Sequence, residues 1–315
     1  MTKIAFVFPG QGSQKVGMGT ELVENHEQSK EFFTNADRVL GFSLSELIEE
    51  GPQEELTVTY NAQPALLTVG AMIASRLKEE GIQPDYTAGH SLGEYTALVA
   101  SGVLTFEEGV LAVHKRGLYM NEAVPAGVGA MAAILGLDAE TVSEITNKIT
   151  ESGDAVQPAN LNCPGQIVIS GTKAGVEKAC HELKEAGARR AIPLDVSGPF
   201  HSSLMKPAAE KLKATLDEIT MHDATPPIIA NVNAEIVEDS NQLKDLLVEQ
   251  LYSPVRWEDS VRTMLENGVT HFIECGPGKV LSGLIKKIDR KATVLSVYDE
   301  QSLAEVLEAS KGWSK

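Results

Sequence analysis

One pentapeptide in the chain has the pattern of a catalytic serine motif. Residues 89–93 read Gly-His-Ser-Leu-Gly, between a predicted strand at 85–88 and a predicted buried helix at 94–101. In such a motif the serine lies on a sharp turn between a strand and a helix, and the glycines let the segments approach closely. The hydroxyl of Ser91 would then face free N–H groups at the helix start, which stabilise negative charge. The motif predicts a serine nucleophile.

A serine nucleophile needs a base, and the chain has seven histidines. His201 is the best candidate, because it lies in Ser-Gly-Pro-Phe-His-Ser-Ser (197–203), a turn that can direct a side chain into a cleft. His90 is adjacent to Ser91, but adjacent side chains diverge at a sharp turn, so we expect His90 to pack. The remaining histidines lie in polar segments or in places typical of structural roles: His26, His114, His181, His222 and His271.

Arg116 is a candidate ligand for an anionic substrate. It falls on a helix predicted to start with a capping box of Thr105 and Glu108, and it shares a face with apolar residues one turn before and after it. A guanidinium that is buried without a partner is costly. The sequence leaves three outcomes open: a carboxylate of the protein, an extension to solvent, or a substrate carboxylate bound by the planar fork.

Composition and charge limit the classes of protein. The chain has 315 residues, of which 43% are hydrophobic and 23% charged, as in a globular protein of one large or two smaller domains. The net charge of −17 argues against nucleic acid or an anionic membrane as a partner. Three cysteines without a CxxC pair favour a reducing, cytoplasmic setting without a zinc site. No segment fits a signal peptide or a membrane span.

Two glycine-rich loops do not match the patterns that bind nucleotides. Residues 9–14 read Pro-Gly-Gln-Gly-Ser-Gln after the first predicted strand (3–8), but Lys15 stands where the dinucleotide fingerprint needs glycine. Residues 276–279 read Gly-Pro-Gly-Lys without the other residues of a P-loop. The sequence therefore predicts no nucleotide cofactor. The first loop can instead supply a backbone N–H to an oxyanion hole.

The order of predicted elements indicates an α/β fold with an insertion. Between residues 127 and 195 we expect four strands and two helices, in order, over 131–135, 139–149, 156–161, 166–170, 174–186 and 190–194. The order β-α-β-β-α-β is that of a ferredoxin-like unit, so 127–195 is predicted to be a small inserted subdomain. Residues 1–126 and 196–315 are predicted to form a hydrolase-like core, with helices on both faces of a mainly parallel sheet.

Six motifs, in their order along the chain, resemble those of the malonyl-CoA:acyl carrier protein transacylases of bacterial type II fatty acid synthesis. The resemblance extends over essentially the whole chain. It rests on residues 9–14, Gly-His-Ser-Leu-Gly-Glu at 89–94, Lys-Arg-Gly at 115–117, Asn-x-Pro-Gly-Gln at 162–166, Gly-Pro-Phe-His-Ser at 198–202, and 276–279.

The resemblance implies a role for each residue of the reacting centre. Ser91 would be the nucleophile and His201 its base. The backbone N–H groups of Gln11 and Leu92 would form the oxyanion hole. The family has no carboxylate in the triad position, and a backbone carbonyl orients the histidine instead. The matching carbonyl here is that of Gln250.

The resemblance also implies a substrate pocket. Arg116 would bind the malonyl carboxylate, and Phe200, Asn162 and Met120 would line the pocket. Related acyltransferases with Phe at the position of Phe200 favour malonyl over methylmalonyl groups. Ser253 departs from the family pattern, because relatives carry Asn there.

The implied reaction transfers a malonyl group from malonyl-CoA, through malonyl-Ser91, to the phosphopantetheine thiol of acyl carrier protein. It needs no metal or bound cofactor. Three alternatives stay open: a serine thioesterase or esterase, an inactive carrier-binding scaffold, and a malonyl loader for a polyketide pathway. Carrier proteins of this system are acidic like this chain, so their docking is predicted to need a local basic patch. The densest candidate comprises Lys279, Lys286, Lys287, Arg290 and Lys291.

Overall fold

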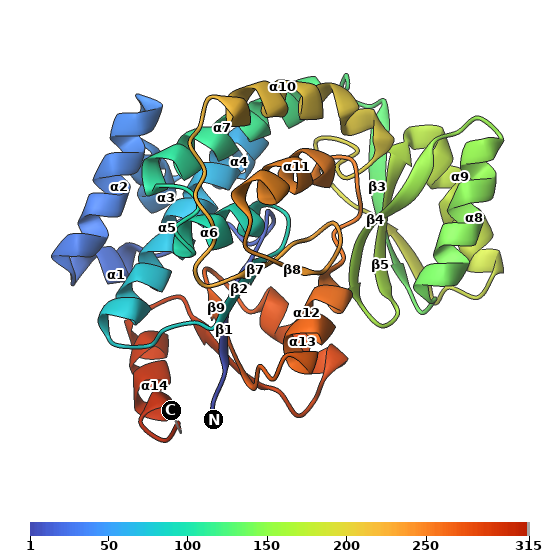
Figure 1. Ribbon diagram of the computed structural model, residues 1–315. Coiled ribbons are helices and arrows are strands. Elements are labelled where there is room, and N and C mark those ends of the chain that lie inside the picture. Colours follow the sequence, from blue (N-terminus) through green and yellow to red (C-terminus); the bar gives the residue numbers. More distant parts are fainter. Residues whose placement is uncertain (314–315) are drawn as a thin grey trace.

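The central sheet is built around the first strand of the chain, β1 (Ile4–Phe8). The computed structural model describes residues 1–313, and the larger sheet has six strands in the order β10-β9-β1-β2-β7-β8 (Figure 1). Every neighbouring pair is parallel except β7 with β8. The carboxyl ends of the parallel strands meet at one edge, where their loops can form a site. The other strands are β2 (Tyr86–Gly89), β7 (Ile228–Ile229), β8 (Ile236–Val237), β9 (His271–Cys275) and β10 (Thr293–Val297).

Helices cover both faces of this sheet, as predicted. In β1, Phe6 and Phe8 belong to one hydrophobic cluster, whereas Ala5 and Val7 belong to a second cluster that contains Trp257. This alternation is the period of a strand buried on both faces. The helices of the core are α1 (Thr20–Glu24), α2 (Glu27–Leu40), α3 (Leu44–Glu50), α4 (Gln53–Thr57), α5 (Thr59–Glu79), α6 (Leu92–Ala100), α7 (Phe106–Glu122), α10 (Lys206–Asp217), α11 (Ser240–Gln250), α12 (Trp257–Glu266), α13 (Val280–Ile288) and α14 (Glu300–Ser310), with a short 3-10 turn, Ser203–Met205, before α10. Within residues 1–313, no helix is both long and apolar enough to cross a membrane.

The long helix α5 starts at Thr59 and contains Pro64 in its second turn. Pro64 has no N–H, so the carbonyl of Tyr60 lacks its partner within the helix. His114 replaces that bond from the neighbouring helix α7, with its Nδ1 2.8 Å from the oxygen of Tyr60. The helix can therefore continue through the proline. The capping box of Thr105 and Glu108 at the start of α7 is confirmed.

The predicted ferredoxin-like unit is confirmed. Its elements are β3 (Gly129–Leu135), α8 (Ala139–Glu151), β4 (Val156–Cys163), β5 (Gln166–Thr172), α9 (Lys173–Glu185) and β6 (Arg190–Pro193). The strands form an antiparallel sheet in the order β4-β5-β3-β6, with α8 and α9 on its outer face (right in Figure 1). A short bridge joins β4 to the core, because Leu161 N donates to Val255 O and Val255 N to Ala159 O. The division at residues 127 and 195 stays a prediction.

Candidate active site

Ser91 lies on a strained turn between β2 and α6. Its φ is 51°, in the left-handed region that non-glycine residues rarely adopt. The two glycines of the motif are required by contact: a Cβ on Gly89 would lie 1.9 Å from the carbonyl carbon of Gly93, and one on Gly93 would lie 2.1 Å from the oxygen of Phe8. The N–H of Ser91 donates to Asn231 Oδ1 at 2.8 Å. The turn thus places the hydroxyl at the carboxyl edge of the sheet.

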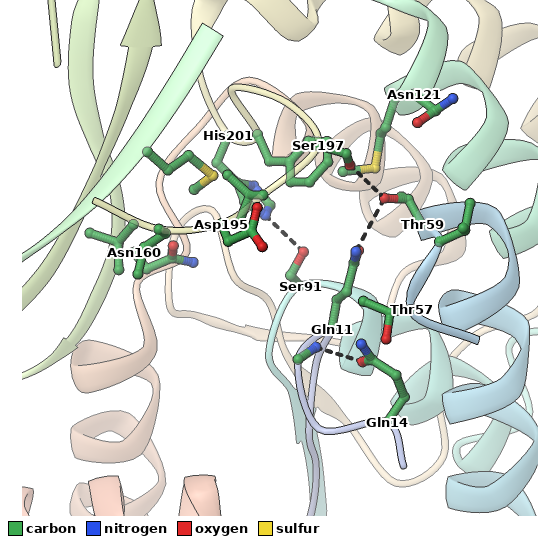
Figure 2. A pocket seen from close by; sticks show the side chains of 18 of the residues that line it. Gln11, Gln14, Thr57, Thr59, Ser91, Asn121, Asn160, Asp195, Ser197 and His201 are labelled. Carbon is green, nitrogen blue, oxygen red and sulfur yellow. Dashed lines mark hydrogen bonds between the residues drawn. The ribbon is translucent and has the colours of Figure 1, made fainter. Parts of the chain in front are cut away.

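His201 is positioned to accept the proton of Ser91. Its Nε2 lies 2.7 Å from Ser91 Oγ, and its Nδ1 lies 2.8 Å from the backbone oxygen of Gln250 at the end of α11 (Figure 2). Because a carbonyl can only accept, Nδ1 carries the hydrogen and Nε2 is free to act as the base. Burial, and then the positive charge of Arg116, lower the pKa of His201 to about 3. The imidazole is therefore neutral at pH 7.

Two backbone N–H groups flank the serine at the positions predicted for an oxyanion hole. Gln11 follows β1 in the neighbouring loop, and Leu92 is the first residue of α6, where the N–H has no acceptor within the helix. In the described part of the chain neither N–H donates to a protein acceptor. The side chain of Gln11 points along the cleft, and its Nε2 donates to Thr59 Oγ1 at 3.1 Å. Thr59 Oγ1 lies 2.9 Å from Ser197 Oγ, so this chain of bonds crosses the mouth of the cleft (Figure 2).

The guanidinium of Arg116 is buried beside Ser91, with 1% of the residue exposed. Its Nη1 donates to Gln63 Oε1 at 2.7 Å, and its Nη2 donates to Gln250 Oε1 at 2.9 Å and to Ser91 Oγ at 3.1 Å. Among residues 1–313 no carboxylate forms an ion pair with it. Arg116 therefore neither pairs with a carboxylate of the protein nor extends to solvent. An anionic group on Ser91 would meet an unpaired buried charge.

A cleft of about 540 Å³ opens above Ser91, between the core and the ferredoxin-like unit. This is the size of a site for a small-molecule ligand. Phe200 and Met120 line it, and Figure 2 shows Ser91 and His201 directed at each other within it. The strands of the ferredoxin-like unit contribute further lining residues that were not predicted: Met131, Asn160 and Val168.

Asn162 does not line this cleft, in contrast to the expectation. Its Oδ1 lies 2.8 Å from Nε2 of His90, and the ring of His90 packs at 5.8 Å from that of Trp257. The register of β4 shifts between Leu161 and Cys163, and such a shift redirects side chains. Asn162 therefore lies behind His90, next to the serine turn.

Three buried polar residues next to the predicted site were missed. Gln63, Glu94 and Asn231 each contact Arg116, Gln250 or Ser91, and each is almost fully buried. Glu94 falls in a helical segment that is otherwise mostly apolar, which is a signal that the sequence does carry. A buried polar side chain must find a partner. Nothing in the sequence around Asn231 indicates its contact with the serine turn.

The five cations predicted to form one basic patch lie along α13 and the turn after it, and the patch stays a prediction. Lys279 follows β9, at the sheet edge that carries the site, and neighbouring Val280 is 58% exposed. Helix α13 then runs back towards the start of β10, because β9 and β10 are parallel neighbours. The nitrogen of Lys286 is also occupied, since it donates to backbone carbonyls after α13. The cations placed towards the opposite edge are Lys286, Lys287, Arg290 and Lys291.

At the carboxyl edge of the sheet a strained serine faces a histidine that is oriented by a backbone carbonyl. Together with an α/β core and a ferredoxin-like insertion, this arrangement defines the class of the protein, an acyltransferase with a serine in its site. The chain belongs to the acyl transferase family, because the acyl transferase domain matches residues 5–304.

Similar proteins define the branch of that family. A malonyl CoA-acyl carrier protein transacylase of Bacillus subtilis (strain 168) is 58% identical over 311 residues, which cover 99% of this chain and 98% of the relative. An acyl carrier protein S-malonyltransferase from Vibrio cholerae superposes with a TM-score of 0.95 at 47% identity, over 97% of this chain and 100% of that one. A malonyl-transacylase solved in complex with a type II PKS acyl-carrier protein also gives 0.95, at 44% identity over 98% and 100% of the two chains.

Proposed function

We propose that the protein transfers the malonyl group of malonyl-CoA to the phosphopantetheine thiol of an acyl carrier protein, for fatty acid synthesis. The observation that carries this proposal is the position of Arg116, whose Nη2 lies 3.1 Å from Ser91 Oγ. An acyl group bonded to that oxygen meets a buried guanidinium. A malonyl group has a carboxylate to bind there, and an acetyl group does not. The relatives' names support the same substrate class.

The first half-reaction acylates the enzyme. Nε2 of His201 takes the proton of Ser91 as Oγ attacks the thioester carbonyl, and the N–H groups of Gln11 and Leu92 bind the developing oxyanion. The tetrahedral intermediate collapses by breaking the C–S bond. The thiolate of coenzyme A leaves with the proton that His201 had taken. Malonyl-Ser91 and a neutral histidine remain, so the base is ready for the next step.

The second half-reaction is the reverse of the first with another thiol. His201 accepts the proton of the phosphopantetheine thiol as the sulfur attacks the ester carbonyl of malonyl-Ser91. Collapse of the intermediate breaks the bond to Oγ, and His201 returns the proton to the serine. The carbonyl of Gln250 orients the imidazole in both steps and stabilises its charged form. No net proton is taken up over the cycle.

The carrier protein is expected to approach over the edge of the sheet that carries Ser91. Lys279 lies on that edge beside the exposed apolar side chain of Val280. A cation next to an apolar side chain suits an acidic partner that buries part of its surface. We therefore propose Lys279 as the main docking cation of the predicted five.

Intact-protein mass spectrometry after mixing with malonyl-CoA tests the proposal. We expect a stable increase in mass equal to one malonyl group. This increase should be absent from Ser91→Ala and should disappear when carrier protein is added. Release of free malonate without a lasting adduct would indicate a thioesterase. No adduct and no malonate would indicate a carrier-binding scaffold.

A further inference from the structure

The side chain of Gln250 lies under the serine turn and is fully buried. Its Oε1 accepts from Arg116 Nη2 at 2.9 Å. Its Nε2 donates to Glu94 Oε2 at 2.7 Å, with the carbonyl of Ser91 at 3.0 Å and Asn231 Oδ1 at 3.1 Å. The amide therefore lies between a buried cation and a buried acid. This contact is separate from that of its backbone carbonyl, which holds His201.

Glu94 acts as a hydrogen-bond acceptor through both oxygens of its carboxyl group. It is 1% exposed, and both of its oxygens accept hydrogen bonds, one from the N–H of Asn231 and one from Gln250. Hydrogen bonds donated to a carboxyl group, and a positive charge near it, favour its ionised form. Burial raises the pKa of Glu94 to about 7, while these hydrogen bonds and the charge of Arg116 act in the opposite direction.

The amide has only one orientation that suits its neighbours. Its oxygen faces the guanidinium and its nitrogen faces the carboxylate, and turning it by half a revolution would place like partial charges together at both ends. Opposite charges buried this close usually contact each other directly. Here one neutral amide keeps Glu94 off Arg116, so the guanidinium keeps a free charge next to Ser91.

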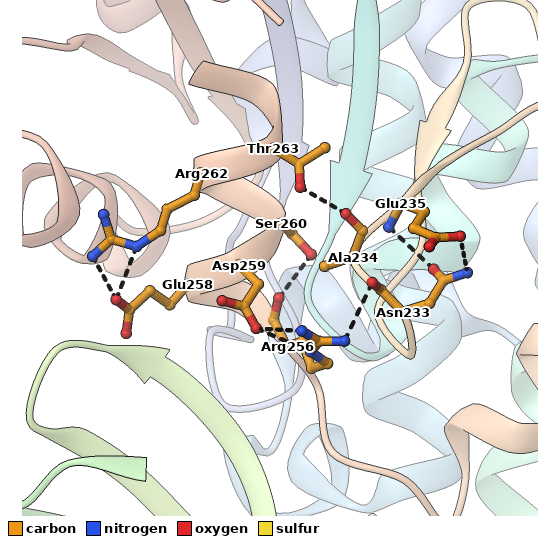
Figure 3. Close-up of polar contacts among 9 residues, drawn as sticks. All are labelled: Asn233, Ala234, Glu235, Arg256, Glu258, Asp259, Ser260, Arg262 and Thr263. Carbon is orange, nitrogen blue, oxygen red and sulfur yellow. Dashed lines mark hydrogen bonds and ion pairs between the residues drawn. The ribbon is translucent and has the colours of Figure 1, made fainter. Parts of the chain in front are cut away.

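The surroundings of the amide are held in place by a second set of contacts. Asn231 Nδ2 donates to the carbonyl of Gly89 at 2.6 Å, and the backbone oxygen of Asn231 accepts from the backbone N–H of Arg256. Figure 3 shows that the turn after Asn231 is bonded to α12 at two points. Arg256, just before the helix, donates to the backbone oxygen of Asn233, and Thr263, in the second half of the helix, donates to that of Ala234. These contacts hold Asn231, which supplies one of the three acceptors around Gln250 Nε2.

We propose that the Gln250 side chain is a specificity-determining spacer: it holds Glu94 away from Arg116, so that the guanidinium remains available for the carboxylate of the acyl group on Ser91. This inference rests on the proposed malonyl transfer. A carboxylate in direct contact with Arg116 would compete with the substrate's carboxylate for the same fork.

A charge swap tests the spacer. The double variant Glu94→Gln/Gln250→Glu keeps one carboxylate and one amide, but it places the carboxylate on Arg116. The rates of malonyl-Ser91 and acetyl-Ser91 formation are measured by rapid-quench intact mass in the same sample. The ratio of malonyl to acetyl rates should fall at least about 10-fold, the equivalent of one charge-assisted hydrogen bond. The single variant Gln250→Glu should show the same fall and provides a second route if the swap does not fold.

Gln242→Glu is the matched control, because it adds the same charge to the exposed side of α11. Its ratio should equal that of the wild type. A folded swap variant that keeps the wild-type ratio would overturn the inference, as would equal losses in both rates, which would indicate a purely structural role. If the wild type itself forms no malonyl adduct, the proposed function fails and the spacer role with it.

Discussion

The hydroxyl of Ser91 has two neighbours with different chemistry. His201 Nε2 at 2.7 Å can take its proton, whereas Arg116 Nη2 at 3.1 Å can only donate to the oxygen. The arginine therefore favours the charged oxygen that forms on deprotonation, and the histidine removes the proton. The two contacts together make a serine hydroxyl reactive without a carboxylate in the triad.

Removal of either member of the serine–histidine pair should remove most of the activity. Ser91→Ala should abolish malonyl transfer, and His201→Ala should lower it by about 10³-fold or more. The double variant should lose little more than Ser91→Ala, because the two residues act as a unit. Single-turnover acylation rates for the three variants provide the measurement. Losses that multiply in the double variant would contradict the pairing.

Arg116 should set the preference for acidic acyl groups. Arg116→Ala should lower malonyl transfer by at least about 10-fold relative to acetyl transfer, since a charge-assisted bond contributes about 1.5–3 kcal/mol. Arg116→Lys should restore only part of the preference, because an ammonium cannot form the planar fork. Competition between the two acyl-CoA substrates measures the ratio directly. An unchanged ratio in the alanine variant would mean that the carboxylate binds elsewhere.

The low pKa of His201 predicts an unusual pH profile. Its folded value of about 3 lies below the ordinary value of 6.5, because of burial and then of Arg116. The base is thus neutral until the solution is strongly acidic, and kcat/KM for malonyl-CoA should show no fall with a pKa near 6.5. The same shift means that protonation favours the unfolded chain as pH falls from 6.5 towards 3, so this contribution to stability is lost over that range. In Arg116→Ala the acid limb should move to higher pH.

At the scale of elements, the site depends on how closely three segments meet. The loop after β1, the end of β2 and the first turn of α6 approach with no room for a side chain at Gly89 or Gly93. The parallel register of β1 and β2, with Phe8 opposite Gly89, brings Gln11 and Leu92 to the same edge. Strand pairing therefore places the two N–H groups that are proposed to form the oxyanion hole.

Gly93→Ala should destabilise the fold and reduce acylation strongly. The new methyl group would meet the backbone oxygen of Phe8, so the first turn of α6 must move, at a cost of about 3 kcal/mol or more. Gly283→Ala is the matched control, because Gly283 lies in α13 with open space around it. That substitution should stabilise the protein by up to about 1 kcal/mol. Chemical denaturation of both variants tests the contrast, and equal effects would refute it.

At the scale of the whole molecule, two units enclose one cleft. The core contributes the serine, the histidine and the arginine, and the ferredoxin-like unit contributes the opposite wall through β3, β4 and β5. The bridge at Val255 ties that wall to the segment between α11 and α12. A net charge of −17 means that an acidic carrier protein is repelled by the overall field and needs local attraction.

Charge reversal should separate the predicted docking cations. Lys279→Glu should raise the KM for carrier protein several-fold at low salt, while the KM for malonyl-CoA changes less. Arg290→Glu/Lys291→Glu, at the other edge of the sheet, should have a smaller effect. The difference should shrink with added salt, because exposed charges are screened within about 10 Å at 0.1 M. A larger effect from the double variant would place the docking surface at that other edge.

The sequence alone determined the fold class and predicted the pair of Ser91 and His201, because both depend on local signals. Hydrophobic periodicity predicts the first strand and the elements around the serine motif, and the order of six elements is sufficient for the ferredoxin-like unit. The serine motif carries its own turn chemistry, so Ser91 could be identified without knowing its neighbours. His201 followed from a turn, and the roles of Arg116 and Gln250 from the resemblance.

Tertiary structure decided everything that depends on contacts between segments far apart in the chain. The bond from His114 lets α5 continue through Pro64, and the shifted register of β4 places Asn162 behind His90. Parallel pairing of β9 and β10 directs α13, and the cations along it, from one edge of the sheet towards the other. The amide of Gln250 lies between Arg116 and Glu94 only because α6, α7 and the end of α11 meet there. Sequence reasoning has no access to such distances, since partners of buried polar groups are chosen by packing.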